Sequence, residues 1–358
     1  MGENVFILGA GASAESGAPL MNNFLDIAED LLREGKFQQD TEKIKRVFDA
    51  KKMLAKTIFE KSFLGINNIE TLFGAIEMAK IINKLGEYSA EQILDVRNGL
   101  VTLIVKTLEK TTIFHDETND EGILPTKPYR DFVALLKDKG IGRSSIITFN
   151  YDIALDFALE KDLGPINYCL NDENNSNVKV LKLHGSINWG RCLTCKNIVP
   201  YKISDFAKDY GLGPERIIPA TFPLSEKLRD LSKYHDHQEF ENIPVIVPPT
   251  WNKTEYQGPI ARVWKEAATE LGLARNIYVF GYSLPESDLF FRYLFALGTI
   301  GDATIRRFWV FDIESEEGNL KKRYEALIGQ GIRDRFNYNS MYFSYAIGNL
   351  RERIGLRV

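Results

Sequence analysis

The sequence is poor in cysteine, with only Cys169, Cys192 and Cys195 among its 358 residues. So small and odd a number in a chain of this length argues against a secreted scaffold held by disulfides. The chain also lacks any apolar run near the roughly 20 residues that a membrane-spanning helix needs. Its first residues lead directly into an expected strand rather than a signal peptide. We therefore expect a cytoplasmic protein with no membrane contact.

The sequence also lacks a large excess of basic over acidic residues or of acidic over basic residues. The sequence has 45 Lys and Arg residues against 49 Asp and Glu residues, which gives a formal net charge of -4. This balance gives no sign of a general surface for nucleic acid or anionic lipid, so we predict no direct nucleic-acid binding. The length suggests about two domains, or one domain with a large insertion.

Short apolar runs are abundant, each bounded by turn residues and most followed by a helical pattern. They cover residues 5–8, 145–149, 178–183, 245–247, 277–280 and 308–311. This alternation predicts an α/β fold with a Rossmann-like, doubly wound, mostly parallel sheet. Ligands of such sheets bind at the carboxyl ends of the strands. We assign residues 1–35, 126–189 and 242–358 to this domain.

Two segments interrupt the strand pattern. Residues 36–125 contain no strand-like run and are predicted as a helical insertion. A helical stripe with i, i+3, i+4, i+7 spacing is formed by Ile69, Leu72, Phe73 and Ile76. Gly86 is expected to stop that helix, and Ser89 with Gln92 has the spacing of a capping box at the start of the next. Residues 190–241 are irregular and polar, and are predicted as a small separate module.

A glycine-rich loop, Gly9-Ala10-Gly11-Ala12-Ser13, follows the first apolar run. Its glycines would let the backbone approach a pyrophosphate, although a tight turn without a ligand needs the same residues. The third glycine of G-x-G-x-x-G is missing, because Ala14 stands there. The acidic residue expected about 20 residues further on, after a second strand, is also missing, since residues 30–35 have a helical pattern. Both absences weigh against a redox dehydrogenase.

Polar residues follow other expected strands. Asn150 and Asp152 come after the run that ends at Phe149, and Asp152 has the alternative role of capping the next helix. His184 follows another strand; a lone histidine is more often structural, but this one falls in the expected ligand crevice. A second candidate phosphate or ribose loop is Gly281-Tyr282-Ser283. Asp312 is a candidate partner of a ribose hydroxyl, or else a surface turn residue.

Together these motifs resemble the sirtuin family. In chain order they are Gly-Ala-Gly-x-Ser with Ser16-Gly17, Thr-x-Asn-x-Asp at 148–152, Leu-His-Gly-Ser at 183–186, and Cys192-x-x-Cys195. Residues 248–251 (Pro-Pro-Thr-Trp), residues 281–288 and residues 68–70 look like the sirtuin-like branch of bacterial anti-phage defence proteins rather than the protein deacylases. The resemblance extends from about residue 7 to residue 312.

The resemblance implies that NAD is bound as a substrate whose nicotinamide–ribose bond is broken. Asn150 and His184 would be catalytic, with His184 as the base. The implied NAD-binding residues are Gly9, Ala10, Gly11, Ala12, Ser13, Ser16, Asn150, Asp152, Gly281, Tyr282, Ser283 and Asp312. Nicotinamide leaves as a neutral molecule, so the site lacks the need for the general acid of ordinary glycosidases. An asparagine can hold a water or a ribose hydroxyl, and a histidine can take the proton.

Departures from the deacylase pattern point to the acceptor. Leu20-Met21-Asn22 replaces Asp-Phe-Arg, and Phe149 replaces the glutamine before Asn150. Prolines in residues 247–250 stand where the deacylases pair with a peptide, and proline lacks the N–H that such pairing needs. We therefore predict an NAD glycohydrolase that releases nicotinamide and ADP-ribose. An NAD-dependent protein deacylase and a non-catalytic NAD or ADP-ribose sensor remain the alternatives.

The family resemblance also bears on metal and partners. Sirtuins hold zinc with two C-x-x-C pairs, and here one pair is left, with His235 and His237 near the place of the second. A Cys2His2 zinc site and a metal-free module both stay open, and we assign no metal ligand. The defence branch implies the NAD-depleting effector of an abortive-infection system, controlled by homo-oligomer formation or by a partner such as a HerA-type ATPase or an argonaute-like protein.

Overall fold

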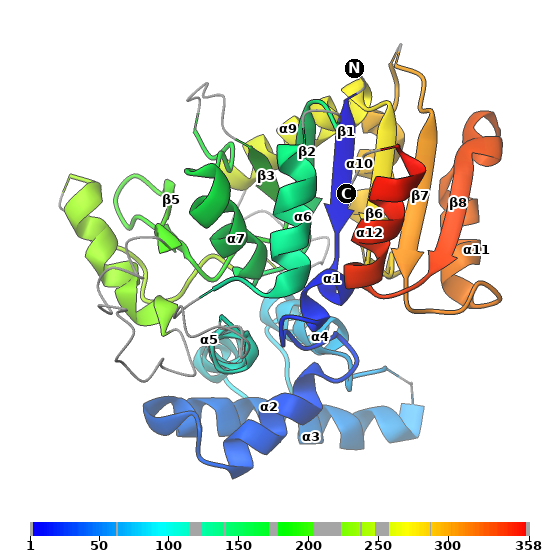
Figure 1. Ribbon diagram of the computed structural model, residues 1–358. Helices are drawn as coiled ribbons and strands as arrows, with labels where there is room; N and C mark the ends of the chain where they lie inside the picture. Colours follow the sequence, from blue (N-terminus) through cyan, green and yellow to red (C-terminus); the bar gives the residue numbers. More distant parts are fainter. Residues whose placement is uncertain are drawn as a thin grey trace.

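The computed structural model describes residues 3–61, 64–114, 124–138, 141–171, 178–203, 223–236, 238–247, 258–286, 288–301 and 303–355, without the side chains of residues 56–61 and 234. Six parallel strands form one sheet in the order β3-β2-β1-β6-β7-β8 (Figure 1). The strands are β1 (Asn4–Leu8), β2 (Ser144–Thr148), β3 (Lys179–Lys182), β6 (Asn276–Phe280), β7 (Arg307–Asp312) and β8 (Phe336–Ser340). This is the predicted doubly wound sheet. Its strand order reverses between β1 and β6, the switch point at which such sheets bind ligands.

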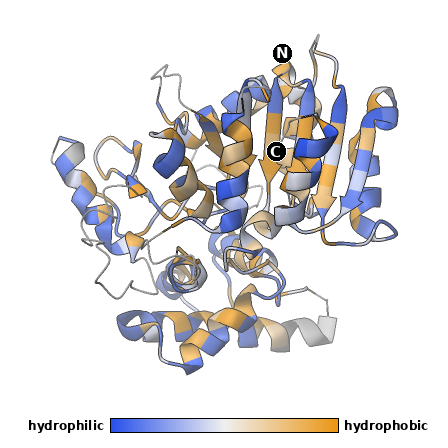
Figure 2. Ribbon diagram, in the orientation of Figure 1, coloured by the Kyte–Doolittle hydropathy of each residue, from blue (hydrophilic) through white to orange (hydrophobic). Residues whose placement is uncertain are grey.

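Helices cover both faces of the sheet. Figure 1 shows α6 (Lys127–Lys137), α7 (Ala154–Leu163) and α12 (Phe343–Arg353) on one face, and α9 (Pro259–Leu273), α10 (Leu289–Gly298) and α11 (Asn319–Leu327) on the other. Every residue of β1 and β6 is buried, and apart from their first residues, Asn4 and Asn276, both strands are apolar, as expected for strands covered on both faces (Figure 2). No helix in the described part of the chain has the length and apolar character to cross a membrane.

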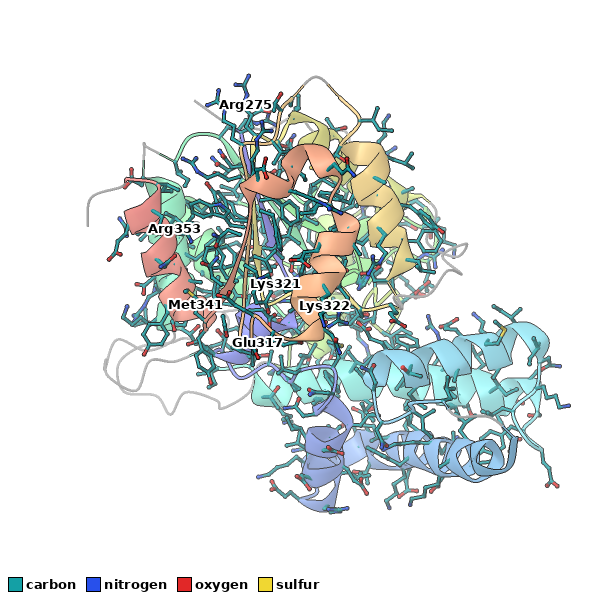
Figure 3. The ribbon with its side chains drawn as sticks, turned by 90° about the vertical axis from the view of Figure 1, so that its right-hand side faces the viewer. Arg275, Glu317, Lys321, Lys322, Met341 and Arg353 are labelled. Carbon is teal, nitrogen blue, oxygen red and sulfur yellow. The ribbon has the colours of Figure 1, made fainter. Side chains whose placement is uncertain are left out.

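A group of helices lies beyond the carboxyl ends of the strands (Figures 1 and 3). Its members are α2 (Phe24–Arg33), η1 (Gln38–Asp40), α3 (Thr41–Lys61), α4 (Ile69–Ile82) and α5 (Ala90–Thr111). The predicted apolar stripe on α4 is buried, and the capping box of Ser89 and Gln92 is present. Helix α4 ends earlier than predicted, because Asn83 in the left-handed conformation (φ 51°) caps it three residues before Gly86.

The segment after β3 is irregular, as predicted. It contains the antiparallel pair β4 (Trp189–Arg191) and β5 (Ile198–Pro200), and the 3-10 helix η2 (Leu224–Tyr234). Trp189 of β4 and Ile198 of β5 pack in the core of the sheet, whereas Leu228 of η2 shares a second core with the helices below the sheet, including Leu100 of α5. The elements not yet named are α1 (Ala10–Ala14) and η4 (Gln330–Arg335). The proposed domain boundaries stay a prediction.

One strand prediction was wrong, and one strand was missed. Residues 245–247 do not join the sheet; Ile246 forms only an isolated antiparallel bridge with Gly185. All three residues are buried, so their apolar run resembles a strand although the run is a connecting segment. The sequence also gave no sign of β8, because this strand lies at the sheet edge and alternates polar and aromatic residues instead of being apolar throughout.

Glycines bring two backbone segments together at the switch point. The N–H groups of Gly9 and Gly11 donate to the carbonyl oxygens of Phe280 and Gly281, at 3.0 and 2.9 Å. A Cβ atom on Gly281 would lie 2.5 Å from the Ala12 nitrogen, and its φ of +58° is one that side chains disfavour. The loops after β1 and β6 can therefore touch only while these positions carry no side chain.

We expect Gly281→Ala to lower the free energy of unfolding by about 2 kcal/mol or more, because it adds both a steric clash and a strained φ. Gly329→Ala is the matched control, since no atom lies within 4 Å of its Cβ position; we expect it to stay within about 0.5 kcal/mol of the parent. Chemical denaturation of the three proteins measures both values. Equal midpoints for the two variants would contradict the close backbone contact.

Candidate functional site

Asn150 is fixed against the glycine-rich loop. Its Nδ2 donates to the carbonyl oxygen of Gly9 at 2.8 Å and to Oγ of Ser13 at 3.0 Å. These two bonds use both amide hydrogens, and no described residue donates to Asn150 Oδ1. Asn150 can therefore meet a ligand as a hydrogen-bond acceptor, which suits a ribose hydroxyl or a water molecule.

A buried polar network supports this asparagine. Ser13 is fully buried, and its Oγ lies 2.8 Å from the hydroxyl oxygen of Tyr129 on α6. Asp152 is buried too, and its Oδ1 accepts a bond from the Ala154 N–H at the start of α7, at 3.0 Å. Burial raises the pKa of the Asp152 carboxyl, although the nearby Lys182 ammonium opposes this. Asp152 is thus not the N-cap of α7, which is Ile153, but it lies one residue earlier and accepts a bond from the first N–H of that helix.

His184 lies beside a carboxylate that the sequence analysis did not select. The His184 side chain is buried after β3, and its Nε2 is 3.7 Å from Oδ2 of Asp288. The Tyr282 hydroxyl donates to the same oxygen at 2.7 Å. The sequence contained one indication of Asp288, because this residue ends the motif at residues 281–288. The motif could not show that Asp288 lies near His184, since only the fold brings this loop next to the end of β3.

The loop after β6 reaches across the sheet edge. The Tyr282 ring stacks on Phe149, which follows β2, with ring centroids 4.0 Å apart and planes at 3°. Because β1 separates β2 from β6 in the sheet, this loop passes the end of β1 to reach Phe149 and His184. Burial raises the pKa of Tyr282 well above its usual value, and the Asp288 charge adds to this, so its hydroxyl stays a donor.

A small cavity lies on the other side of the switch point. Its volume is about 170 Å³, and its lining includes Gly11, Ala14, Gly281 and Asp312. Whole small-molecule sites usually have about 300 Å³ or more, so this cavity suits one part of a larger ligand. Burial raises the pKa of Asp312, whose Oδ1 accepts a bond from the Glu314 N–H at 3.0 Å. Asp312 is thus at the cavity rather than on an open surface turn.

Other predicted residues have different surroundings. Ser16 is fully buried, and its Oγ lies 2.5 Å from Oγ1 of Thr126, so its hydroxyl already has a partner within the protein. Ser283 is exposed, and Ala10 and Gly11 are partly exposed. Their contacts with a ligand stay a prediction. The Pro-Pro-Thr-Trp motif at 248–251 lies outside the described residues.

The N–H groups of the glycine-rich loop are largely used within the protein. Besides the bonds of Gly9 and Gly11 to the opposite loop, the Ala12 N–H donates to the Gly9 carbonyl at 3.0 Å. A phosphate cradle formed by all five N–H groups is therefore not available in this arrangement. Within residues 9–13, Ala10 and Gly11 are the two that are partly exposed.

Cys192, Cys195 and His235 come together in the small module. Their ligand atoms all lie within 4.8 Å of one another, and Cys195 Sγ is 3.1 Å from His235 Nε2. Tetrahedral zinc would hold such a sulfur and nitrogen about 3.5 Å apart, so a small adjustment suffices. Burial opposes ionisation of Cys192, but hydrogen bonds from the Cys195 and Thr194 N–H groups hold its pKa below the usual value. These three residues fit three of the four ligand positions of a structural zinc ion, and His237, the remaining candidate ligand, lies outside the described residues.

We expect the purified protein to contain about one zinc ion per chain. Cys195→Ser should lose the metal and lower the melting temperature, because it removes one ligand. Cys169→Ser is the control and should keep the metal, since Cys169 is not part of the cluster. Elemental analysis with thermal unfolding tests this. Zinc-free protein with the same melting temperature before and after chelator treatment would contradict it.

No protein-family model and no curated protein matches this sequence. Solved structures that resemble it include Sir2Tm bound to a propionylated peptide, with 13% identity and a TM-score of 0.40, covering 99% of this chain and 94% of that one. A complex of a Sir2 homologue with NAD has 16% identity and a TM-score of 0.46, covering 99% and 89%. Sir2 bound to an acetylated peptide has 14% identity and a TM-score of 0.40, covering 99% and 94%. Likeness at this level does not place the chain in a family.

Proposed function

We propose that this protein binds NAD across the ends of β1, β2, β6 and β7 and hydrolyses its nicotinamide–ribose bond. The observation that carries the proposal is the fixed orientation of Asn150, whose two hydrogens bind the glycine-rich loop while its oxygen is left for a ligand. The motif resemblance supports NAD as that ligand. In this arrangement the small cavity with Asp312 receives one end of the dinucleotide.

The chemistry needs an oriented ribose and a nucleophile, because cationic nicotinamide is a good leaving group without protonation. Asn150 Oδ1 accepts a hydrogen bond from water or from a ribose hydroxyl and so fixes its position. His184 takes the proton that this hydroxyl or water loses. Asp288, near His184 Nε2, stabilises the positively charged imidazole that results, and the Tyr282 hydroxyl holds Asp288 in place.

Backbone pairing removes two of the N–H groups that could bind an acylated peptide, which agrees with water as the acceptor. The N–H groups of Val245 and Val247 donate to the carbonyl oxygens of Trp189 and His184, each at 2.8 Å. These N–H groups are therefore engaged within the protein and are not free to pair with an extended peptide. The products of the proposed reaction are nicotinamide and ADP-ribose.

We expect purified protein to release nicotinamide from NAD, measured by chromatography. Asn150→Ala and His184→Ala should each lower the rate about 100-fold or more, because each removes a group that acts on the reacting atoms. Asn98→Ala is the matched control, since Asn98 is a partly buried asparagine on α5, away from these contacts. Full turnover in both site variants would rule out the assignment, and release that requires an acetylated peptide would favour a deacylase instead.

We further propose that NAD depletion by this enzyme is the toxic output of an anti-phage system, and that the enzyme stays inactive until infection, when self-assembly or a partner protein activates it. The resemblance to the defence branch supports this role. A homo-oligomer would make the specific rate of nicotinamide release rise with protein concentration, because assembly follows mass action. Assays at graded concentrations, with light scattering in parallel, measure this. A constant specific rate together with a monomer at all concentrations would exclude control by self-assembly.

A further inference from the structure

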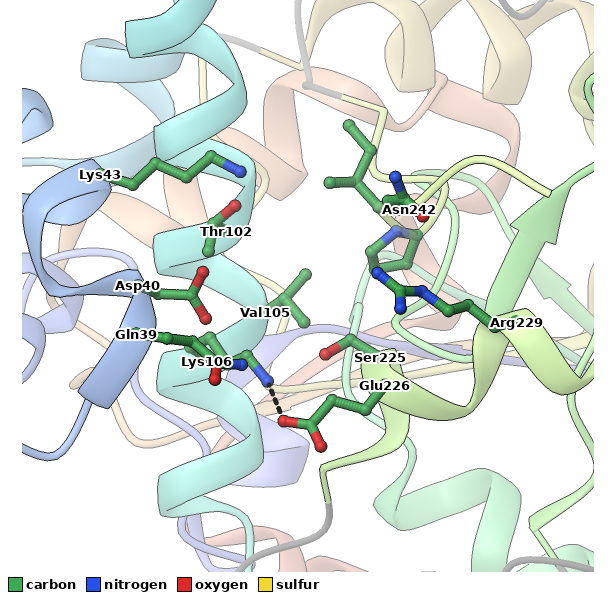
Figure 4. A pocket seen from close by; sticks show the side chains of 12 residues that line it. Gln39, Asp40, Lys43, Thr102, Val105, Lys106, Ser225, Glu226, Arg229 and Asn242 are labelled. Atoms are coloured by element: carbon green, nitrogen blue, oxygen red, sulfur yellow. Dashed lines mark hydrogen bonds and ion pairs between the residues drawn. The ribbon is translucent and has the colours of Figure 1, made fainter.

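A second and larger cavity lies away from the candidate NAD site, between the helices below the sheet and the small module. Its volume is about 410 Å³ (Figure 4). One wall comes from η1, α3 and α5, and the other from η2 and residues 242–244. A cavity of this size is within the usual range of about 300–1,000 Å³ for small-molecule sites and has no room for a folded partner.

Charged side chains enter this cavity from both walls. Lys43 of α3 and Arg229 of η2 extend toward each other from opposite sides (Figure 4). At the floor, Lys106 offers no free charge, because its Nζ is 2.9 Å from Glu109 and 3.3 Å from Glu226, two carboxyl groups to one ammonium; burial raises the pKa of Glu109 and so disfavours its charged form. In contrast, neither Lys43 nor Arg229 forms an ion pair with any residue that the structure describes.

The remaining lining defines the class of ligand. Two unmatched cations on facing walls attract an anion, and arginine and lysine are the side chains that bind phosphate best. The lining also contains Asp40 and the polar groups of Thr102 and Asn242, which can accept hydrogen bonds from hydroxyl groups. A carboxylate would repel a purely anionic ligand, so hydroxyl groups on the same molecule match the cavity better.

Both walls continue directly into the candidate NAD site. Helix α5 lines the cavity at Lys106 and ends at Thr111, and the Ile113 N–H then donates to the Ser16 carbonyl at 2.8 Å. On the other wall, Pro244 leads into residues 245–247, where the Val247 N–H donates to the His184 carbonyl at 2.8 Å. A ligand that joins the walls would therefore restrain two segments, one bonded to Ser16, three residues after the glycine-rich loop, and the other bonded to His184.

We propose that this cavity binds a small phosphate-bearing molecule with hydroxyl groups, such as a sugar phosphate or a nucleotide, and that binding restrains both segments. The inference does not depend on NAD hydrolysis. In this proposal Lys43 and Arg229 bind the phosphate group, and the Asp40 carboxylate accepts a hydrogen bond from a hydroxyl group.

Isothermal titration of the full chain with ribose 5-phosphate and with inorganic pyrophosphate tests binding. We expect the wild type to bind ribose 5-phosphate, and Lys43→Gln and Arg229→Gln each to weaken it about 10- to 100-fold, the value of one charge-assisted hydrogen bond. Lys45→Gln and Lys233→Gln are matched controls on the same elements; these lysines pair with Glu42 and Asp230 and do not line the cavity. They should bind within twofold of wild type.

Amide hydrogen exchange tests the restraint. Saturating ribose 5-phosphate should slow exchange at Ile113 and Val247 in the wild type and the control variants, but not in Lys43→Gln at the same concentration.

Absence of binding to wild type, or binding by the Lys43 and Arg229 variants that equals binding by the wild type, would overturn the site. Binding without any change at these two amides would overturn the restraint, and pyrophosphate binding without ribose 5-phosphate binding would overturn the role of the hydroxyl groups.

Discussion

The contact between the loops after β1 and β6 is the constraint on which the candidate site depends. Gly9 and Gly11 meet Gly281 backbone to backbone, at the point where the strand order reverses. Parallel strands end at one edge of the sheet, so this contact determines where the two loops sit relative to the end of β2. Asn150 then binds the first loop through Gly9, and Phe149 stacks on the second through Tyr282.

Around this contact, several buried polar groups pair with one another. Ser13 meets Tyr129, Asp288 meets Tyr282, and the buried Lys182 ammonium lies 2.9 Å from the Asp156 carboxylate. Such groups lose their hydration on folding, so each needs a partner inside the protein. A buried polar group without a partner would raise the free energy of the folded protein, so the paired arrangement of these side chains is strongly favoured. The site therefore has a defined geometry without a bound ligand.

The helices below the sheet belong to the same physical unit as the site. Helix α5 reaches from the larger cavity to the glycine-rich loop, and Ser16 is held between Thr126 and Ile113. The Ser16 hydroxyl, which was predicted to contact NAD, is therefore paired with Thr126 and anchors the chain just after the glycine-rich loop. The insertion is more than packing surface, because it determines the position of the loop that it contacts.

The sequence by itself determined the sheet class, five of its six strands and the capping of α5, because local patterns of burial and turn chemistry encode them. It also placed the candidates Asn150 and His184 at strand ends, while the roles proposed for them come from the family resemblance. It failed where the local signal was ambiguous: residues 245–247 are buried but not in the sheet, and the edge strand β8 is only half apolar. Only the tertiary structure decided that Asp288 meets His184, that Ser16 is anchored internally, and that Lys43 faces Arg229. These pairs join residues distant in sequence, and their distances depend on how the chain packs.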